Sequence, residues 1–348
     1  MTTRGATLAA LLAALARPAW WLLGLAGFLA RGGIVLFLLA IVTLPSPLAI
    51  SNVVAPLLMP IVFGGVTPAL AALVATGIGS IVALVLVGAL IGAATEVVLI
   101  DEARDAAVEE GVPVVPRPLT GRWLIGRVAI AHLLAHIPLV VVAALGSIQI
   151  VGVAYLELTS PVDVVTPLPL RIVGGAIAPI LAIVVAWVVG EISGGLAARS
   201  IVLGGSSVPR SVSRAYGDLV SRPGSALLPG LLTTGLLALD LAAMLAAVAL
   251  AWTIARSRLV EIPAAPVAIG LALASFAAIW CLALLVSGLI AAWRSVAMTF
   301  EAERVASADA LRRAHPDDPD GRSVAGTFGA PANSRPGDWS AHNGGGSL

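Results

Sequence analysis

Six stretches of predominantly apolar residues constrain this chain more than any other feature of its sequence. They cover roughly residues 20–43, 67–99, 125–150, 172–198, 226–254 and 266–297. A helix needs about 20 apolar residues to cross the hydrocarbon core of a bilayer. The pattern therefore predicts an all-α membrane protein, with six transmembrane helices in a domain that spans residues 20–300.

The composition excludes a soluble globular domain. Of the 348 residues, 59% are hydrophobic and only 11% are charged, whereas soluble domains carry about 25% charged residues. The formal net charge of +1 argues against a nucleic-acid partner, which would require clustered basic residues to neutralise phosphates. Cys281 is the only cysteine, so intrachain disulfide bonds and cysteine metal clusters are excluded. All 20 basic residues are arginine, which indicates the mutational bias of a GC-rich bacterial genome.

The arginines near the predicted helix ends set the expected orientation, because cytoplasmic loops of membrane proteins are enriched in basic residues. With the N-terminus inside, the inner side collects sixteen arginines and the outer loops hold three, namely Arg171, Arg256 and Arg258. We therefore expect a multi-pass protein of a bacterial plasma membrane with both termini in the cytoplasm. Residues 301–348 are expected to form the end of the last helix and a disordered cytoplasmic tail, beginning at about residue 305, because this segment is polar and rich in Gly and Pro.

Two segments outside the spans are expected to form amphipathic helices at the inner membrane surface. Residues 1–19 place four leucines on one stripe at helical spacing, namely Leu8, Leu11, Leu12 and Leu15. The segment "SVSRAYGDLVS" does the same with Val212, Tyr216 and Leu219. The alternative for the first segment, a signal peptide cut after Ala16, is less favoured because cleavage would leave the following apolar span with its orientation unanchored.

Two sequence marks recur and indicate an internal repeat. An Arg-Pro dipeptide precedes each inward-starting span, at Arg17-Pro18, Arg117-Pro118 and Arg222-Pro223. A pair of small residues recurs on each return span, at Gly88 and Gly92, Gly190 and Gly194, and Gly288 and Ala292. Small residues four apart let two helix backbones approach closely in lipid. The marks predict three tandem helical hairpins in parallel orientation, with coincidence in an Ala/Gly-rich chain as the alternative.

Ionisable residues inside a span are expensive, so they are the default candidates for function. These are Arg31, His132, His136, Glu191 and Asp240, whereas Glu96 and Arg294 lie close enough to the span ends to be interpreted as interfacial. The repeat places a polar residue at similar depth in each inward-starting helix. We therefore expect an interior cluster in which Arg31 and Asp240 neutralise each other and Glu191 pairs with a histidine.

Three uses of this cluster remain open. The polar residues can be structural contacts between helices, a proton- or ion-coupled transport site, or a metal site at "HLLAH", in which His132 and His136 share a helix face. The metal signal is weak because the pair lacks the glutamate of HExxH and no third ligand is marked by spacing. No catalytic residue, metal site or cofactor is predicted. The sequence contains no P-loop, GxSxG or dinucleotide-binding motif.

The stretch "RPAWWLLGLAGFLARGG", residues 17–33, resembles the membrane domain attached to some glycerophosphodiester phosphodiesterases, a likeness that covers the first span only. The catalytic domain of those enzymes is absent, so the resemblance implies a helper or scaffold role in the envelope. We expect a non-enzymatic membrane module that organises lipid or protein partners, with a membrane protein or a second copy as the possible partner. A small ion-coupled transporter is the alternative, and a membrane-embedded metalloenzyme is the third possibility.

Overall fold

A computed structural model describes residues 2–39, 67–112, 114, 123–160, 168–221, 223–260 and 266–314. Within these ranges the chain forms helices and no strands. The helices are α1 (Thr3–Ala16), α2 (Pro18–Phe28), the π-helical turn η1 (Leu29–Gly33), α3 (Ile34–Leu39), α5 (Pro68–Glu109), α6 (Leu124–Ala135), α7 (Ile137–Thr159), α8 (Leu168–Gly175), α9 (Ile177–Val202), α10 (Val208–Ser221), α11 (Pro223–Val260) and α12 (Pro266–Ala314).

The apolar helices are those of a polytopic membrane protein. Among the described residues, five helical segments are long and apolar enough to cross a bilayer, and the bent α1/α2 unit would bring the number to six. Two of them continue well beyond the predicted spans, α5 to Glu109 and α12 to Ala314, because the more polar segments that follow are rich in good helix formers such as Ala, Glu and Arg. The expected helix end after residue 301 extends to Ala314, and residues 315–348, which contain most of the expected disordered tail, lie outside the described ranges.

Three of the predicted spans are broken rather than continuous. The first breaks at η1, where Gly32 adopts a φ of +103° that favours glycine, and its predicted end at residues 40–43 lies outside the described ranges. The third breaks at His136, just before Pro138, and the fourth at Ala176, just before Pro179. Proline has no N–H to donate to the preceding turn, so it favours a break there.

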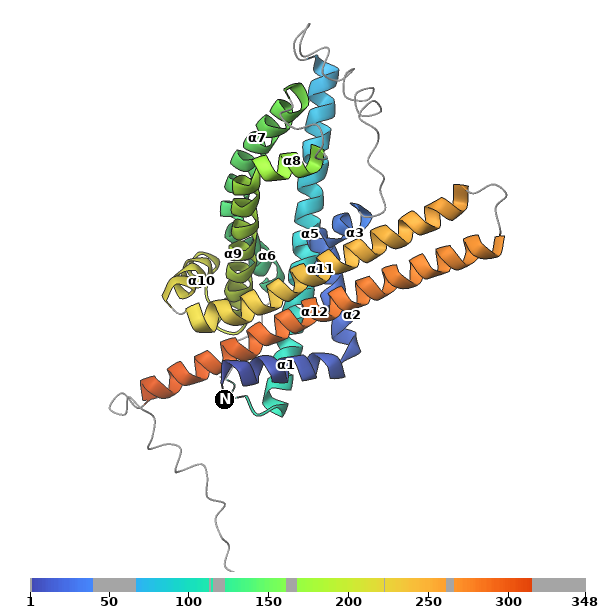
Figure 1. Cartoon of the computed structure of the whole chain (residues 1–348). Helices are drawn as coiled ribbons and strands as arrows, with labels where there is room; N and C mark the ends of the chain where they lie inside the picture. The colour runs from blue at the N-terminus through green and yellow to red at the C-terminus, as the bar shows by residue number, and fades with distance from the viewer. Residues whose placement is uncertain are drawn as a thin grey trace, which may run out of the picture.

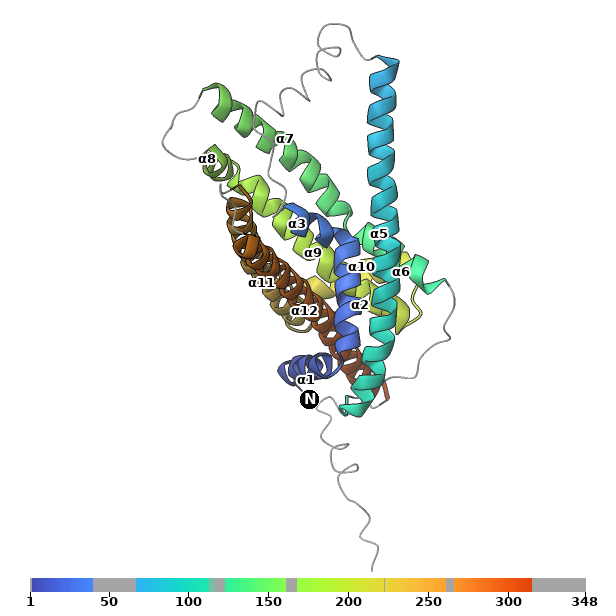
Figure 2. The same cartoon turned by 90° about the vertical axis from the view of Figure 1, so that its right-hand side faces the viewer.

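The long helices meet at the end of the molecule that carries α1 and α10, which we call the convergent end (Figure 1). The α11–α12 pair forms an antiparallel hairpin that runs obliquely to α5 in both views, whereas α9 packs against α6 and α7 (Figure 2). Helix α2 packs along both α12 and α5. The core at this end combines apolar residues from α1, α2, α5 and α12, among them Trp20, Leu99 and Phe300.

Both predicted amphipathic segments are helices packed on the convergent end. Helix α1 turns away from the α2–η1 segment by 101° and buries its alanine face, Ala6, Ala10, Ala13 and Ala14, against the core. Of its leucine stripe, Leu8, Leu12 and Leu15 are exposed, which is the arrangement expected of a helix that lies on a membrane surface. Helix α10 packs on α9 and buries Ser211, Ala215 and Leu219.

Candidate functional site

Glu96 on α5 lies at the centre of a buried set of charges. Its carboxylate accepts a hydrogen bond from Arg199 Nη1 at 2.9 Å and lies 2.8 Å from His132 Nε2. It also forms an ion pair with Arg31 of η1. Because only 6% of Glu96 is exposed, the carboxylate would be costly to bury without these partners. One side chain thus connects α5 with η1, α6 and α9.

Arg199 on α9 is the most deeply buried cation of this set, with 2% of the residue exposed. Besides Glu96, its guanidinium donates hydrogen bonds to the Gly195 carbonyl at 2.6 Å and to the Ser295 carbonyl at 2.8 Å. The Ser295 hydroxyl lies 3.0 Å from Nη2. These contacts attach α9 to α12 at the depth of Glu96.

A second carboxylate, Glu191 on α9, has its own two partners. Arg294 Nη2 on α12 lies 2.6 Å from one carboxylate oxygen, and His136 Nε2 lies 3.4 Å from the other. The Nδ1 atom of His136 lies 2.8 Å from the carbonyl oxygen of His132, which orients the ring at the α6/α7 break. The expected pairing of Glu191 with a histidine is therefore present. We refer to the eight residues of both groups as the ion-pair network: Arg31, Glu96, His132, His136, Glu191, Arg199, Arg294 and Ser295.

The expected pairing of Arg31 with Asp240 is wrong. Arg31 donates to Glu96 and, at 3.0 Å, to the Gly92 carbonyl, whereas Asp240 accepts a hydrogen bond from Ser287 at 3.0 Å. The break at Gly32 ends the helix beside α5, so the Arg31 side chain meets α5 rather than α11. Asp240 belongs to the α11–α12 contact and not to the ion-pair network.

Glu96 and Arg294, which the sequence predicts to be interfacial and outside the candidate cluster, are both members of the network. The sequence contained a signal that Glu96 lies at a helix contact. This residue follows Gly88 and Gly92 at intervals of four residues and therefore shares their helix face. Arg199 was not among the predicted residues. It follows Gly195 by the same interval on α9, and this spacing was the available signal.

The small residues of the return helices make room for the network. A Cβ atom on Gly92 would lie 2.7 Å from Arg31 Nε, and one on Gly194 would lie 2.5 Å from His132 Nδ1. A Cβ on Gly190 would lie 2.9 Å from His136 Cδ2. Glycine at these positions therefore allows buried polar side chains to lie directly against a neighbouring helix.

The remaining small residues serve close backbone contacts. Gly88 meets the backbone of Ala30, and Gly288 and Ala292 of α12 meet Gly24 and neighbouring residues of α2. The third small-residue pair thus contacts α2 of the first predicted hairpin. These small residues allow the backbones of α2 and α12 to approach closely.

The first Arg-Pro dipeptide lies at the start of α2, and the structure describes the other two only in part. Pro18 occupies the first turn of α2, where the missing N–H costs nothing. Arg17 pairs with Glu109 and lies 4.9 Å from the Trp20 ring centroid. Pro223 begins α11, whereas Arg117, Pro118 and Arg222 lie outside the described residues.

A cavity of about 600 Å³ lies against the network. Five of the network's charged residues line it: Arg31, Glu96, Glu191, Arg199 and Arg294. Most of its other lining is apolar and includes Leu23, Phe28, Trp187, Leu237, Leu241 and Leu245. We call it the membrane cavity, because α2, α5, α9, α11 and α12, the apolar helices, provide its walls. His132, His136 and Asp240 are not among the residues that line it.

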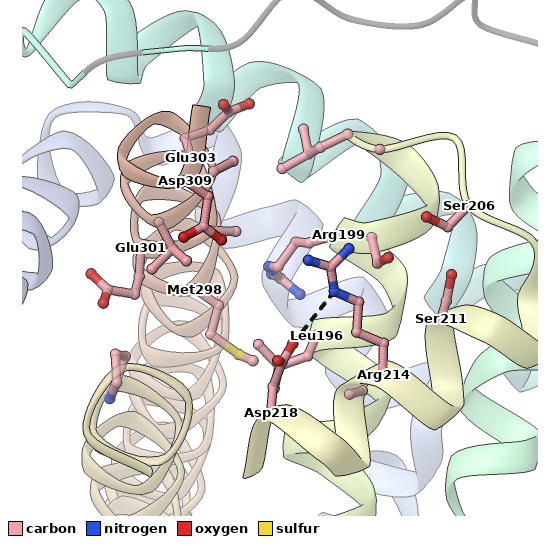
Figure 3. Close-up of a pocket in the computed structure, with 18 residues that line it drawn as sticks. Leu196, Arg199, Ser206, Ser211, Arg214, Asp218, Met298, Glu301, Glu303 and Asp309 are labelled. Carbon is pink, nitrogen blue, oxygen red and sulfur yellow. Dashed lines mark ion pairs between the residues drawn. The ribbon is translucent and has the colours of Figure 1, made fainter. Parts of the chain in front are cut away.

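A second cavity of about 290 Å³ lies between α9, α10 and α12 and is more polar at its rim (Figure 3). Its lining includes Ser211, Arg214, Asp218 and Glu301. We call it the convergent-end pocket. Arg199 and Met298 line both cavities, so these two side chains stand between them.

Tyr216 of α10 joins this region to the α6/α7 break. Its hydroxyl donates a hydrogen bond to the Ala135 carbonyl at 2.7 Å, one of the carbonyls left without a helical partner at the end of α6. Burial raises the pKa of the Tyr216 phenol, so the hydroxyl remains a donor at neutral pH.

The two histidines of "HLLAH" do not form a shared ligand pair. His132 lies against Glu96 and His136 against Glu191, with 6.5 Å between the ring centroids. Within the described ranges, no three His, Cys, Asp or Glu side chains are grouped as a metal site would require. The arrangement is that of an ion-pair network connecting helices.

Comparison with known proteins adds no relative: no protein-family model, curated protein or solved structure matches the chain. The class therefore follows from the fold itself. The chain is a polytopic helical protein with membrane-spanning apolar helices, a buried ion-pair network and a cavity beside it.

Proposed function

We propose that this chain is a non-enzymatic module of the bacterial plasma membrane that binds and organises lipid. The observation that carries the proposal is the membrane cavity. It combines apolar walls with a charged end built from three helices and η1, and a lipid combines an acyl chain with a polar headgroup in the same way. Binding cavities for small molecules usually have about 300–1,000 Å³ and a few convergent polar groups.

The proposal includes six spans arranged as three similar hairpins. In the first hairpin Arg31 lies against Gly92, and in the second His132 lies against Gly194. In the third, Asp240 contacts Ser287, next to Gly288. In the first two hairpins the inward-starting helix thus places a polar side chain against a small-residue pair, which supports a common origin for these units.

The orientation with both termini in the cytoplasm rests on the sixteen arginines assigned to that side. Cysteines introduced at Ser46 and Ser206, with Cys281 replaced by Ala, should react with a membrane-impermeant maleimide from opposite sides of intact cells. Labelling from the same side would contradict the six-span topology.

Lipid binding can be tested with two neighbouring variants. Ala242 and Ala243 are both exposed, but Ala242 lines the membrane cavity and Ala243 does not. The full chain, purified in mild detergent, should retain phospholipid in native mass spectra. Ala242→Trp should reduce this retention because the indole fills the cavity, and Ala243→Trp should not. Equal retention by both variants would contradict a lipid site in this cavity.

A small proton- or ion-coupled transporter is the second candidate. The observation that favours it is that Arg199 and Met298 alone are shared by the linings of the two cavities, so a short barrier separates them. The full chain in liposomes that enclose a pH-sensitive dye should then conduct protons after a pH jump, and Glu96→Gln should abolish this flux. Flux equal to that of empty liposomes would exclude proton coupling.

The resemblance of residues 17–33 to the phosphodiesterase-linked membrane domain fits the first candidate, because such a domain would assist a separate enzyme. A protein partner or a second copy of the chain would then share the lipid. Crosslinking in intact membranes, followed by electrophoresis, would show a partner as a discrete higher band. The chain running only at its own mass after crosslinking would argue against one.

A further inference from the structure

We infer that the lipid of the membrane cavity carries an anionic headgroup, and that Arg294 and Arg31 bind it. The inference rests on the proposed function, since it concerns the same cavity and names the chemistry of its ligand. Three separate features of the cavity point to it: the balance of charge, the unused donors of two arginines, and the distribution of apolar wall.

The charge that lines the cavity does not balance. Three arginines, Arg31, Arg199 and Arg294, face two carboxylates, Glu96 and Glu191. The other nearby ionisable groups do not correct this, because His132 and His136 carry no negative charge and Asp240 bonds Ser287 outside the lining. An unbalanced charge is costly in a low-dielectric interior. One anionic group in the cavity would remove the surplus.

Two of the arginines have donors available for that anion. Within the described residues, the one recorded partner of Arg294 is Glu191, reached through Nη2, although a guanidinium has five N–H donors. Arg31 likewise makes its hydrogen bonds to Gly92 and Glu96 through Nη2. Their side chains are 15% and 23% exposed, whereas Arg199 is only 2% exposed and directs Nη1 and Nη2 to Glu96, Gly195 and Ser295. Arg294 and Arg31 are therefore the two cations that a ligand can reach.

The rest of the lining indicates an amphiphile rather than a small inorganic anion. Beyond the charged end the walls are formed by large apolar side chains, including Phe28, Trp187, Leu237, Leu241 and Leu245. These side chains form an apolar surface, which favours contact with an acyl chain over contact with a hydrated phosphate. The cavity is partly open to its surroundings, which leaves a route for a lipid to enter with its headgroup toward the arginines.

The test measures lipid selectivity in the full chain by native mass spectrometry. Purified protein is mixed with equal amounts of dioleoyl phosphatidylglycerol and dioleoyl phosphatidylcholine, which share acyl chains and differ in charge. We expect the anionic lipid to be bound about fivefold more tightly, the effect of one arginine near an anionic headgroup. Equal binding of the two lipids would overturn the inference while leaving lipid binding itself intact. If the protein bound neither lipid, or if Ala242→Trp did not reduce the retention of lipid, the proposed function would be contradicted instead.

Two variants, which remove the positive and the negative charge of the same ion pair, distinguish an effect on lipid binding from damage to the fold. Arg294→Gln removes the surplus positive charge and should abolish the preference for phosphatidylglycerol. Glu191→Gln breaks the same ion pair but increases the surplus, so the preference should rise. A fall in both variants would show that only the ion pair matters and would overturn the inference. Arg256→Gln, at an exposed position of α11, is the control and should leave the preference unchanged.

A final arm separates a lipid headgroup from a free anion. Inorganic phosphate at 10-fold excess should leave phosphatidylglycerol bound, because phosphate gains nothing from the apolar wall. Displacement of the lipid by phosphate would identify the cavity as a site for a small anion and would overturn the assignment to lipid.

Discussion

The two halves of α5 show how differently one apolar helix can be used. From residue 71 to residue 87 every side chain is exposed, whereas from Gly88 onward the helix packs against α2, η1, α6 and α12. A soluble protein could not leave such a length of Ile, Leu and Val uncovered. In a bilayer, lipid covers an apolar surface as well as another helix does, so apolarity alone does not join helices.

The difference between the halves lies in their small and polar residues. The packed half holds Gly88, Gly92 and Glu96 on one face, and these residues meet Ala30 and Arg31. The exposed half contains Gly77 and Gly79, but a Cβ on either would meet nothing within 4 Å. Helix α12 differs, because its first half packs on α11 through Phe276, Ile279 and Trp280, but it too is most deeply buried in its second half, around Arg294 and Ser295. The predictions below test whether ion pairs and close contacts define the packed halves.

The largest effect is expected when Glu96 is removed. Glu96→Ala leaves Arg31 and Arg199 without their carboxylate in a buried site, so the free energy of unfolding should fall by about 3–5 kcal/mol. The measurement is denaturant unfolding of the purified chain in detergent micelles. Glu110→Ala, at an exposed position just after the end of the same helix, is the control and should change the value by less than about 0.5 kcal/mol. Equal effects would show that the network does not hold the helices together.

A matched pair of glycine substitutions tests the close contacts. A Cβ on Gly24 would lie 2.6 Å from the backbone nitrogen of Ala292, so Gly24→Ala should force α2 and α12 apart and cost about 1–3 kcal/mol. Gly77→Ala makes the same chemical change in the exposed half of α5 and should be neutral or slightly stabilising, since alanine favours helix. Equal melting temperatures of the two variants would contradict the comparison.

Double-mutant cycles test which charges are partners. Arg31→Gln and Glu96→Gln should be coupled by about 0.5–3 kcal/mol, because the two side chains form an ion pair. Arg31→Gln and Asp240→Asn should be additive within about 0.5 kcal/mol, because Asp240 bonds Ser287 instead. If the second cycle showed coupling and the first showed additive effects, Arg31 would pair with Asp240, as the sequence led us to expect.

The smallest of the four effects is expected at the edge of the packed region. Tyr216→Phe removes the hydrogen bond to the Ala135 carbonyl at the α6/α7 break and should cost about 1 kcal/mol. Hydrogen exchange at the amides of α6 and α7 near His136 should increase in this variant. Unchanged exchange there would mean that α10 does not support the break.

The sequence was sufficient to predict the apolar helices, because their length and composition alone separate them from the loops. The breaks at His136 and Ala176 were also within reach, since Pro138 and Pro179 follow each break closely. The break at Gly32 was harder to predict. It depends on the local backbone of Arg31 and Gly32, and a span drawn only from apolarity continues through both residues.

The candidate site was predicted in part, for a physical reason. The number of residues from a helix start predicts how deep in the membrane a side chain lies, and this number placed Arg31 and His132 at a similar depth. Depth does not give direction, so Arg31 was assigned to Asp240 when the bend at Gly32 turns it to Glu96. Arg199 was missed because charges near span ends usually lie at the membrane surface, whereas this one is buried between α9 and α12.

An electron cryomicroscopy map of the full chain in nanodiscs of phosphatidylglycerol tests the central claim most directly. The account predicts that Glu96 lies between Arg31 and Arg199, and that density for one lipid occupies the membrane cavity with its headgroup about 3 Å from Arg294 or Arg31. A map in which α2 and α11 close the cavity, or in which Glu96 has no arginine partner, would contradict it.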